Sequence, residues 1–147
     1  MEMVLDKDIQ EIYLSIEKSI DKLRDKTILI TGAAGFLGRY FMSLLTYANS
    51  KSMEKPITII ALDNYITSSK PIGDNVLRGD QNIEWIQGDA SIGAQLPNKF
   101  DYIIHAAGIA SPEHYRANPL LTIDVTINVT KSLLERARTD KSRMIRS

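Results

Sequence analysis

The segment TILITGAAGFLG, residues 27–38, places three glycines at regular spacing directly after a run of apolar and β-branched residues. Glycine has no Cβ, so Gly32, Gly35 and Gly38 allow a tight turn and let another group approach the backbone. If a helix starts at this turn, its first N–H groups and its dipole form a site for an anion such as a diphosphate. The pattern predicts a nucleotide-binding turn. The alternative is that the glycines serve only the packing of the turn.

An acidic residue ends the next apolar run, ITIIALD (57–63), and supports the nucleotide interpretation. An acid at this place accepts hydrogen bonds from the hydroxyls of an adenosine ribose, which is the role we expect for Asp63. A carboxylate repels a 2′-phosphate, so the pattern favours NAD over NADP, while Arg39 leaves NADP as the alternative. No Gly-Lys-Ser or Gly-Lys-Thr triplet occurs, which excludes the phosphate loop of nucleoside triphosphatases.

Length and composition narrow the class of protein. The 147 residues suffice for one domain with a sizeable core, and 18 basic residues balance 18 acidic ones, so no nucleic-acid or membrane partner is expected. There are no cysteines, which excludes disulfides and thiolate metal sites, and we expect no metal centre. No apolar run is long enough to span a bilayer, and the acidic, amphipathic N-terminus does not resemble a signal peptide. These features predict a cytoplasmic protein.

The glycine turn needs a strand before it and a helix after it, and the pattern of the chain supplies both. Continuous apolar runs predict strands at 27–31, 57–63, 83–89 and 101–108, and RMIRS (143–147) begins a further one. Helices are expected at about 36–49 and 119–139, with a polar loop at 64–82. Apolar strands that alternate with helices indicate an α/β, Rossmann-like, doubly wound parallel sheet.

Ahead of this unit, residues 3–24 show the period of an amphipathic helix. We therefore divide the chain into an N-terminal helix, 1–25, and a nucleotide-binding domain, 26–147. The apolar stripe of the helix docks on the domain behind it or, as the alternative, pairs with a second subunit. The stripe consists of Leu5, Ile9, Ile12, Ile16, Ile20 and Leu23.

Four motifs in order, TGAAGFLG, ALDNYITSSK, QGDA and HAAGIASPEHYRANP, resemble the extended short-chain dehydrogenase/reductases. Among these, the chain is similar to the NAD-dependent nucleotide-sugar epimerases, dehydratases and UDP-glucuronate decarboxylases, from about Lys26 to Arg146. The resemblance implies a dinucleotide cofactor, and a nucleotide sugar as substrate of the complete enzyme.

The resemblance also implies roles for individual residues. Those around the diphosphate would be Gly32, Ala33, Gly35, Phe36, Leu37 and Gly38. Asp63 and Asn64 would hold the adenosine ribose, and Asp89 and Ala90 would border the adenine. The floor on the nicotinamide side would be Ala106, Ala107 and Gly108. The alternatives are that Asp63 and Asp89 only cap turns, and that the small residues only relieve crowding at the end of the sheet.

Two histidines invite catalytic roles, because histidine titrates near neutral pH. His105 falls within an apolar strand, so we expect a structural hydrogen bond to a neighbouring loop instead. His114 and Ser111 lie in a segment that, by the resemblance, faces the sugar nucleotide, and they are candidates for substrate contact.

The resemblance further implies a catalytic Tyr-x-x-x-Lys and a sugar-binding lobe, which we expect outside this chain. Tyrosines 13, 40, 47, 65, 102 and 115 are accordingly given no catalytic role. If the strand order is 3-2-1-4-5 and the fifth strand is incomplete, the fourth lies at an open edge, which predicts a homodimer or other self-association.

The function expected is the NAD-binding portion of an enzyme that transiently oxidises a nucleotide sugar at C4, with binding but no turnover by this chain alone. The alternative is a non-catalytic protein: a dinucleotide sensor, or an interaction scaffold that uses its N-terminal helix for docking.

Overall fold

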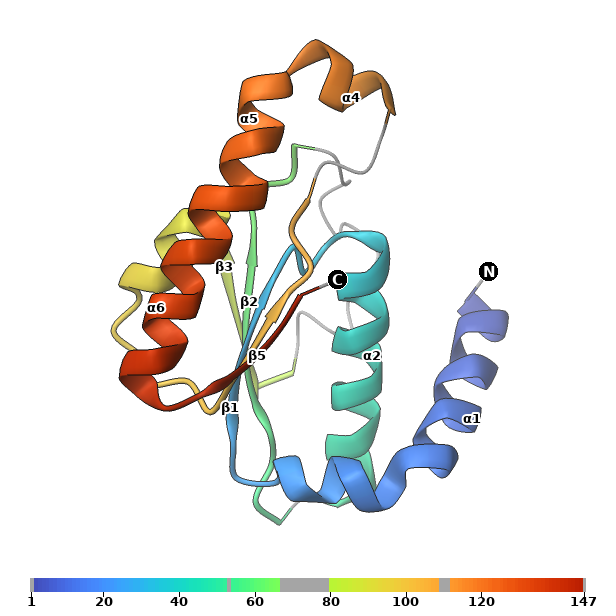
Figure 1. Ribbon diagram of the computed structural model, residues 1–147. Helices are drawn as coiled ribbons and strands as arrows, with labels where there is room; N and C mark the ends of the chain where they lie inside the picture. The colour runs from blue at the N-terminus through green and yellow to red at the C-terminus, as the bar shows by residue number, and fades with distance from the viewer. Residues whose placement is uncertain (1, 53, 67–79, 109–111, 147) are drawn as a thin grey trace.

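Five parallel strands, in the order β3-β2-β1-β4-β5, form the central sheet of the computed structural model. The structure describes residues 2–52, 54–66, 80–108 and 112–146. Helices lie on both faces of the sheet (Figure 1), as expected for a doubly wound α/β fold. The strands are β1 (Thr27–Thr31), β2 (Thr58–Asp63), β3 (Ile83–Gln87), β4 (Tyr102–His105) and β5 (Arg143–Arg146). The helices and helical turns are α1 (Glu2–Ile20), η1 (Asp21–Leu23), α2 (Phe36–Lys51), η2 (Ala90–Gln95), α4 (Pro112–Ala117), α5 (Pro119–Asp124), η3 (Val125–Val129) and α6 (Thr130–Asp140).

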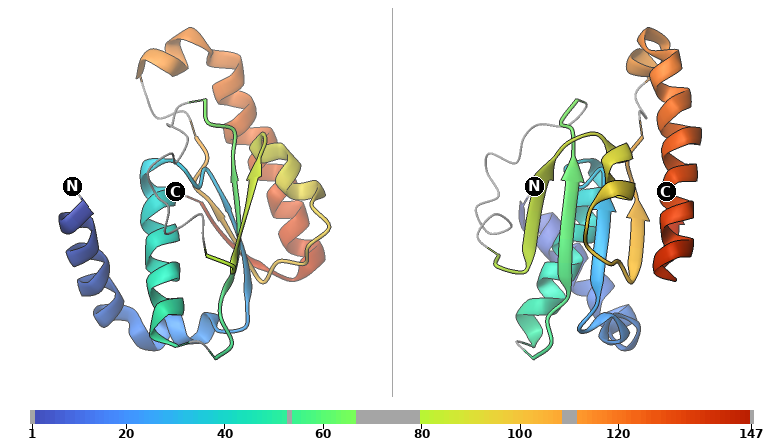
Figure 2. Two further views of the ribbon diagram at one scale, coloured as in Figure 1. Left: turned by 180° about the vertical axis from the view of Figure 1, so that it is seen from behind. Right: turned by 90° about the vertical axis from the view of Figure 1, so that its left-hand side faces the viewer.

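The central strands are buried on both sides, which explains why their sequences are apolar throughout. Leu29 of β1 is fully buried in the core cluster beneath α6 and η2, and Ile30 in the cluster beneath α1 and α2. Figure 2 shows the two helical layers on opposite faces of the sheet. The apolar runs therefore predicted the right architecture.

The N-terminal helix α1 docks on α2, which confirms the first of the two interpretations of its stripe. Tyr13 packs edge-on against Tyr47 of α2, with ring centroids 5.3 Å apart. Ile9 and Ile20 are buried as expected, but Ile12 and Ile16 are 37% and 38% exposed. The contact face is rotated towards Tyr13, so the predicted stripe was wrong in part.

Residues near the end of the given sequence form the edge strand β5 of the described sheet. β5 pairs in parallel with β4, with Tyr102 opposite Arg143 and His105 opposite Arg146. The expectation of an open edge at the fourth strand was therefore wrong, because the last residues cover it and β5 becomes the edge.

The long C-terminal helix, expected at 119–139, is interrupted. It consists of α5, the π-helical turn η3 and α6. A short helix, α4, also occupies part of the segment before it, for which no helix was predicted. Among the described residues, no helix combines the length and the apolar character required to cross a membrane.

Candidate functional site

The glycine turn after β1 is fixed by steric contacts with its neighbours. Gly32 has φ +71°, and a Cβ there would lie 2.6 Å from the carbonyl carbon of Ala106. A Cβ at Gly38 would lie 2.0 Å from the carbonyl oxygen of Gly32. Side chains at these two positions would collide with backbone atoms, so packing alone requires glycine at both.

Gly35 differs from the other two glycines. Its φ is −72°, it precedes the first residue of α2, and it lines an open cleft. The N–H groups of Phe36 and Leu37 belong to the first turn of α2, where the helix offers them no carbonyl partner. The turn thus places free donors and the positive end of the helix dipole beside the cleft.

Asp63, at the end of β2, is 7% exposed and is held by two backbone groups. Its Oδ2 accepts a hydrogen bond from the Ala34 N–H (2.9 Å), and its Oδ1 accepts one from the Tyr65 N–H (2.7 Å). The carboxylate therefore connects the glycine turn to the turn after β2. A carboxylate has about four acceptor positions, so this bonding leaves capacity for a ligand hydroxyl.

The end of β3 supplies a second carboxylate. Asp89 caps η2, with its Oδ1 accepting from the Ser91 N–H at 2.8 Å, and Ala90 beside it is buried. The Gly88 N–H donates to the backbone carbonyl of Asp63 (2.9 Å), which holds the ends of β2 and β3 together.

Small residues follow β4 and form another part of the cleft. The Ala106 N–H donates to the carbonyl of Thr31 (2.9 Å), which keeps the backbone of Ala106 against Gly32. Crowding explains a small residue there. It does not explain Gly108, because a Cβ at Gly108 would meet no heavy atom within 4 Å in the described part of the chain.

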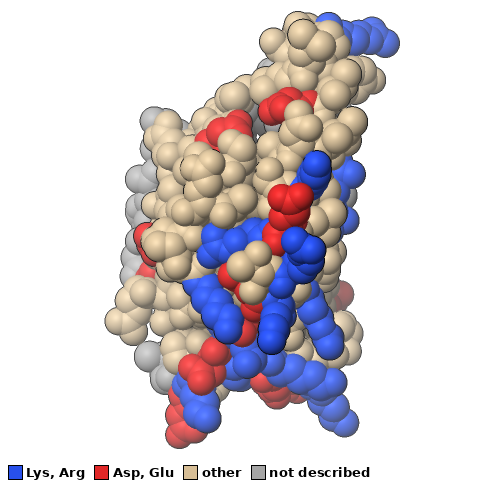
Figure 3. All heavy atoms as spheres, turned by 60° about the vertical axis from the view of Figure 1, so that its left-hand side comes forward, with Lys and Arg blue, Asp and Glu red and all other residues tan. Residues whose placement is uncertain are grey.

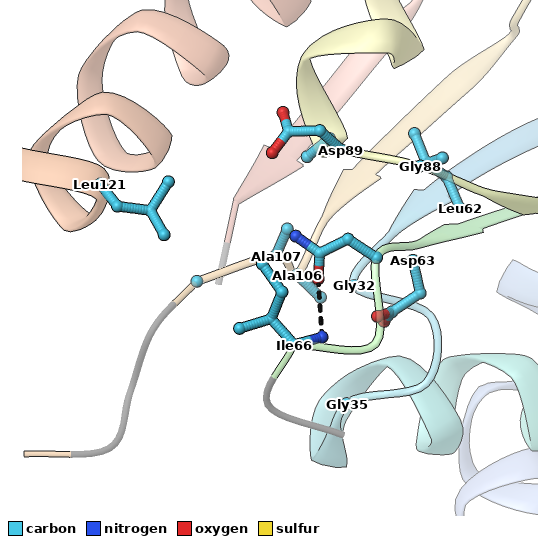
Figure 4. A pocket seen from close by; sticks show the side chains of 13 residues that line it. Gly32, Gly35, Leu62, Asp63, Ile66, Gly88, Asp89, Ala106, Ala107 and Leu121 are labelled. Atoms are coloured by element: carbon cyan, nitrogen blue, oxygen red, sulfur yellow. Dashed lines mark hydrogen bonds between the residues drawn. The ribbon is translucent and has the colours of Figure 1, made fainter. Parts of the chain in front are cut away.

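These elements meet in one cleft at the carboxyl ends of the strands (Figure 4). From the predicted set, the residues that line it are Gly32, Gly35, Asp63, Asn64, Asp89, Ala90, Ala106, Ala107 and Gly108. Four predicted cofactor-binding residues do not line it: Ala33 and Gly38 are buried beneath the turn, and the side chains of Phe36 and Leu37 are exposed outside it.

Four further residues line the cleft that the sequence did not single out: Leu62, Ile66, Gly88 and Leu121. Leu62 and Gly88 adjoin predicted residues and follow from the strand ends. Ile66 belongs to the motif ALDNYITSSK, but only Asp63 and Asn64 of that motif were given a role. Leu121 lies outside the motifs and is brought to the cleft by a helix.

His105 has a structural partner, though not the predicted one. The ring is fully buried, and its Nδ1 lies 2.7 Å from Oγ1 of Thr31, the register partner of His105 on the adjacent strand. The bond therefore joins two strands, where a loop was expected. His114 lies in α4, and Ser111 falls outside the described residues.

One tyrosine does have a lysine four positions later, contrary to the sequence-based expectation: Tyr47 is followed by Lys51. The pair lies at the C-terminal end of α2, whereas the cleft lies at the N-terminal end of this helix. The Lys51 Nζ is 4.4 Å from the centroid of the Tyr47 ring, and a hydrogen bond with Tyr47 raises the pKa of Lys51. This pair cannot reach a ligand in the cleft.

Comparison with known proteins shows which family the chain resembles. The model of the NAD dependent epimerase/dehydratase family matches residues 28–146. UDP-glucuronic acid decarboxylase 2 of Arabidopsis thaliana is 32% identical over 80% of this chain and 24% of its own length. UDP-glucuronic acid decarboxylase 6 of the same plant is 34% identical over 80% of this chain and 32% of its own length. The chain thus spans about a quarter to a third of these relatives.

Solved structures agree on the fold. An epimerase from Methanothermobacter thermautotrophicus matches 91% of this chain and 38% of its own, with a TM-score of 0.70 and 24% identity. The Bordetella bronchiseptica enzyme WbmF, solved in complex with NAD⁺, matches 85% of this chain and 36% of its own, with a TM-score of 0.62 and 18% identity. Because the family model covers most of the chain, the chain belongs to the NAD dependent epimerase/dehydratase family.

Proposed function

We propose that this chain binds NAD in the cleft, as the cofactor-binding part of an enzyme that acts on a nucleotide sugar by epimerisation, dehydration or decarboxylation. The observation that carries the proposal is the convergence of the α2 N-terminus, the Asp63 carboxylate and a small-residue floor in one cleft. When bound, NAD would supply the nicotinamide ring that accepts a hydride from C4 of the sugar.

The diphosphate would lie over Gly32 and Gly35 and accept hydrogen bonds from the N–H groups of Phe36 and Leu37. A diphosphate is a strong acceptor with negative charge, which suits the first turn of a helix. Ala33 and Gly38 would act from beneath, since both are buried and their small size lets the turn close.

The adenosine ribose would lie at Asp63 and Asn64, with the adenine towards Asp89 and Ala90. The side-chain oxygen of Asn64 accepts from the Ile66 N–H at 3.1 Å, the bond drawn as a dashed line in Figure 4. The Asp63 carboxylate would accept hydrogen bonds from the ribose hydroxyls as well as from its two backbone donors. Its charge would repel the 2′-phosphate of NADP. The Arg39 Nε donates to the carbonyl of Ala34 (2.9 Å), which holds that cation beside the turn.

The nicotinamide half would rest on Ala106, Ala107 and Gly108. Sugar contacts are proposed for His114 and Ser111. None of the described residues around the cleft forms a Tyr-x-x-x-Lys pair, so we expect this chain to bind the dinucleotide without turning over a sugar.

Titration calorimetry with NAD and with NADP tests this proposal. The wild-type chain should bind NAD more tightly than NADP. In Asp63→Asn, loss of the charge should weaken NAD binding about tenfold and narrow the preference over NADP, because a hydrogen bond to a charged group contributes about 1.5–3 kcal/mol. Glu84→Gln, on the exposed face of β3, is the matched control. Absence of NAD binding by the wild type, or an unchanged preference in Asp63→Asn, would contradict the proposal.

We also propose that the chain pairs with a second copy through the outer ridge of the C-terminal helix. Figure 3 shows mostly uncharged side chains over the upper part of this face and many Lys and Arg side chains over the lower part. Asp124 is exposed near one end of the ridge and Arg138 near the other, so an antiparallel pair would match opposite charges. The ridge consists of Leu120, Ile123, Ile127 and Leu134, which are 53–80% exposed.

Sedimentation equilibrium tests the pairing. The wild type should form a dimer, and Ile127→Asp should shift it to a monomer because the ridge loses its apolar centre. Leu14→Asp, at a 72% exposed position on α1, is the control and should stay dimeric. A wild-type monomer across a wide concentration range would contradict the proposal.

A further inference from the structure

The π-helical turn η3 changes which residue of α5 faces the cleft. In a regular α-helix, residues eleven apart lie on the same face, within about 20°. An unbroken helix would therefore place Thr122 above Leu133, which is fully buried against the sheet. A π turn holds one extra residue. The extra residue shifts the register of α5 by one position. As a result, Leu121 and not Thr122 lies on the same face of the helix as Leu133.

The register of the lower half of this helix is fixed by its contacts. Leu133 and Ala137 are buried in the core, and the Arg136 Nε and Asp140 Oδ2 are 2.8 Å apart in a largely buried ion pair. Arg136 also donates to the carbonyls of Ala94 and Leu96. Because α6 cannot rotate without breaking these contacts, η3 decides the orientation of α5.

The upper half extends beyond the strands. α5 lies past the carboxyl ends of the sheet (Figure 1) and packs mainly on α4 and η3. In this position Leu121 lines the cleft, whereas its neighbour Leu120 is 80% exposed. Only a residue on the inner side of α5 can contact a ligand held at the strand ends.

Ile66 lies across the cleft from Leu121. Figure 4 shows both side chains directed towards the open space, with Asp89 at its border. Ile66 follows β2 and is itself 56% exposed, although it lies beside Asp63 and Asn64 in the cleft lining. Two aliphatic side chains that face each other over a polar base suit a flat ring with apolar faces and a polar edge.

We propose that Leu121, set by the π-helical turn, and Ile66 are ligand-contacting residues that hold the adenine ring of the dinucleotide between them. The proposal rests on the proposed NAD binding and adds two residues to it. Adenine fits better than nicotinamide, because Ile66 and Asp89 belong to the β2 and β3 side of the glycine turn, whereas Ala106 and Ala107 lie on the β4 side.

The test compares affinities for NAD, AMP and nicotinamide mononucleotide, measured by titration calorimetry or ligand-observed NMR. Leu121→Ala should weaken NAD and AMP binding about fivefold to tenfold, because the adenine would bury less apolar surface against the shorter side chain. Nicotinamide mononucleotide, which has no adenine, should bind as it does to the wild type. Ile66→Ala should follow the same pattern, and Leu121→Met should retain most of the affinity.

Two neighbours provide matched controls. Leu120→Ala removes the same side chain one position earlier, on the exposed side, and is measured at a protein concentration low enough to disfavour pairing. Thr122→Val tests the residue that an unbroken helix would direct to the cleft. Both should leave AMP affinity within twofold of the wild type. Circular dichroism and thermal unfolding should show that all variants retain the fold.

The possible outcomes separate this inference from the proposed function. If the wild type binds NAD but Leu121→Ala binds AMP equally well, the inference is wrong and NAD binding stands. An effect of Thr122→Val in place of Leu121→Ala would overturn the role given to η3. If the wild type binds neither NAD nor AMP, both proposals fail.

Discussion

The glycine turn and helix α5 face each other across the cleft, but they are held in different ways. The turn is fixed by contacts with little tolerance, since Gly32 and Gly38 lie against backbone atoms and Asp63 is bonded to two N–H groups. α5 extends beyond the sheet and presents exposed apolar side chains. The turn suits the charged diphosphate, whose position depends on fixed N–H groups, and α5 suits an apolar contact with the adenine ring.

The largest effect on stability is expected within the turn. Gly38→Ala would place a Cβ about on top of the Gly32 carbonyl, so we expect a loss of about 3 kcal/mol or more in unfolding free energy. Gly35→Ala meets only one contact at 3.2 Å and should cost less than about 1 kcal/mol. Urea unfolding measures the unfolding free energy of both variants. Similar losses in the two would show that the turn is not sterically fixed.

The second largest loss of stability is expected at Asp63, whose carboxylate joins the glycine turn to the turn after β2. Asp63→Ala removes the partner of two N–H groups, at Ala34 and Tyr65, and should lower the unfolding free energy by about 2 kcal/mol. Asp89→Ala removes only a cap on η2 in a more exposed place and should cost about 1 kcal/mol. If Asp63→Ala proves the milder of the two, Asp63 does not organise the turn.

A smaller loss of unfolding free energy is expected when a buried threonine loses a hydroxyl that forms a hydrogen bond, and no loss when the removed hydroxyl forms none. Thr31→Val removes the hydrogen bond to His105 and should destabilise the chain by about 1 kcal/mol. Thr46→Val should cause no loss, because the Thr46 Oγ1 is buried without a hydrogen-bond partner among the described residues. Thermal unfolding of the two variants provides the comparison, and equal losses would remove the structural role given to the Thr31–His105 bond.

The smallest effect is expected on the looser side of the cleft. Leu120→Ser, at an 80% exposed position of α5, should change the unfolding free energy by less than about 0.5 kcal/mol. Urea unfolding at a protein concentration low enough to disfavour pairing is the measurement. A loss of about 2 kcal/mol would mean that α5 is as firmly held as the turn, and the comparison would fail.

The sequence predicted what depends on local pattern. Continuous apolar runs marked β1 to β4, although the expected ends at Asp89 and Gly108 ran past the strands into the turns that line the cleft. Glycine spacing located the turn because glycine has a steric reason to be there. A cytoplasmic location and the division of the chain after residue 25 stay predictions.

What the sequence did not predict depends on contacts between distant segments. The stripe of α1 included Ile12 and Ile16, but docking on α2 favours a face centred nearer Tyr13. The π-helical turn has no proline or glycine to mark it, so Leu121 could not be assigned to the cleft. The pairing of β5 with β4 closed an edge that periodicity alone left open.

The central claim is that the amides at the start of α2 bind a diphosphate while Asp63 binds the attached ribose. A crystal structure of the chain at saturating NAD tests this most directly. The account predicts diphosphate oxygens within hydrogen-bonding distance of the Phe36 and Leu37 N–H groups, with ribose hydroxyls at the Asp63 carboxylate. An empty cleft, or NAD bound elsewhere on the chain, would contradict it.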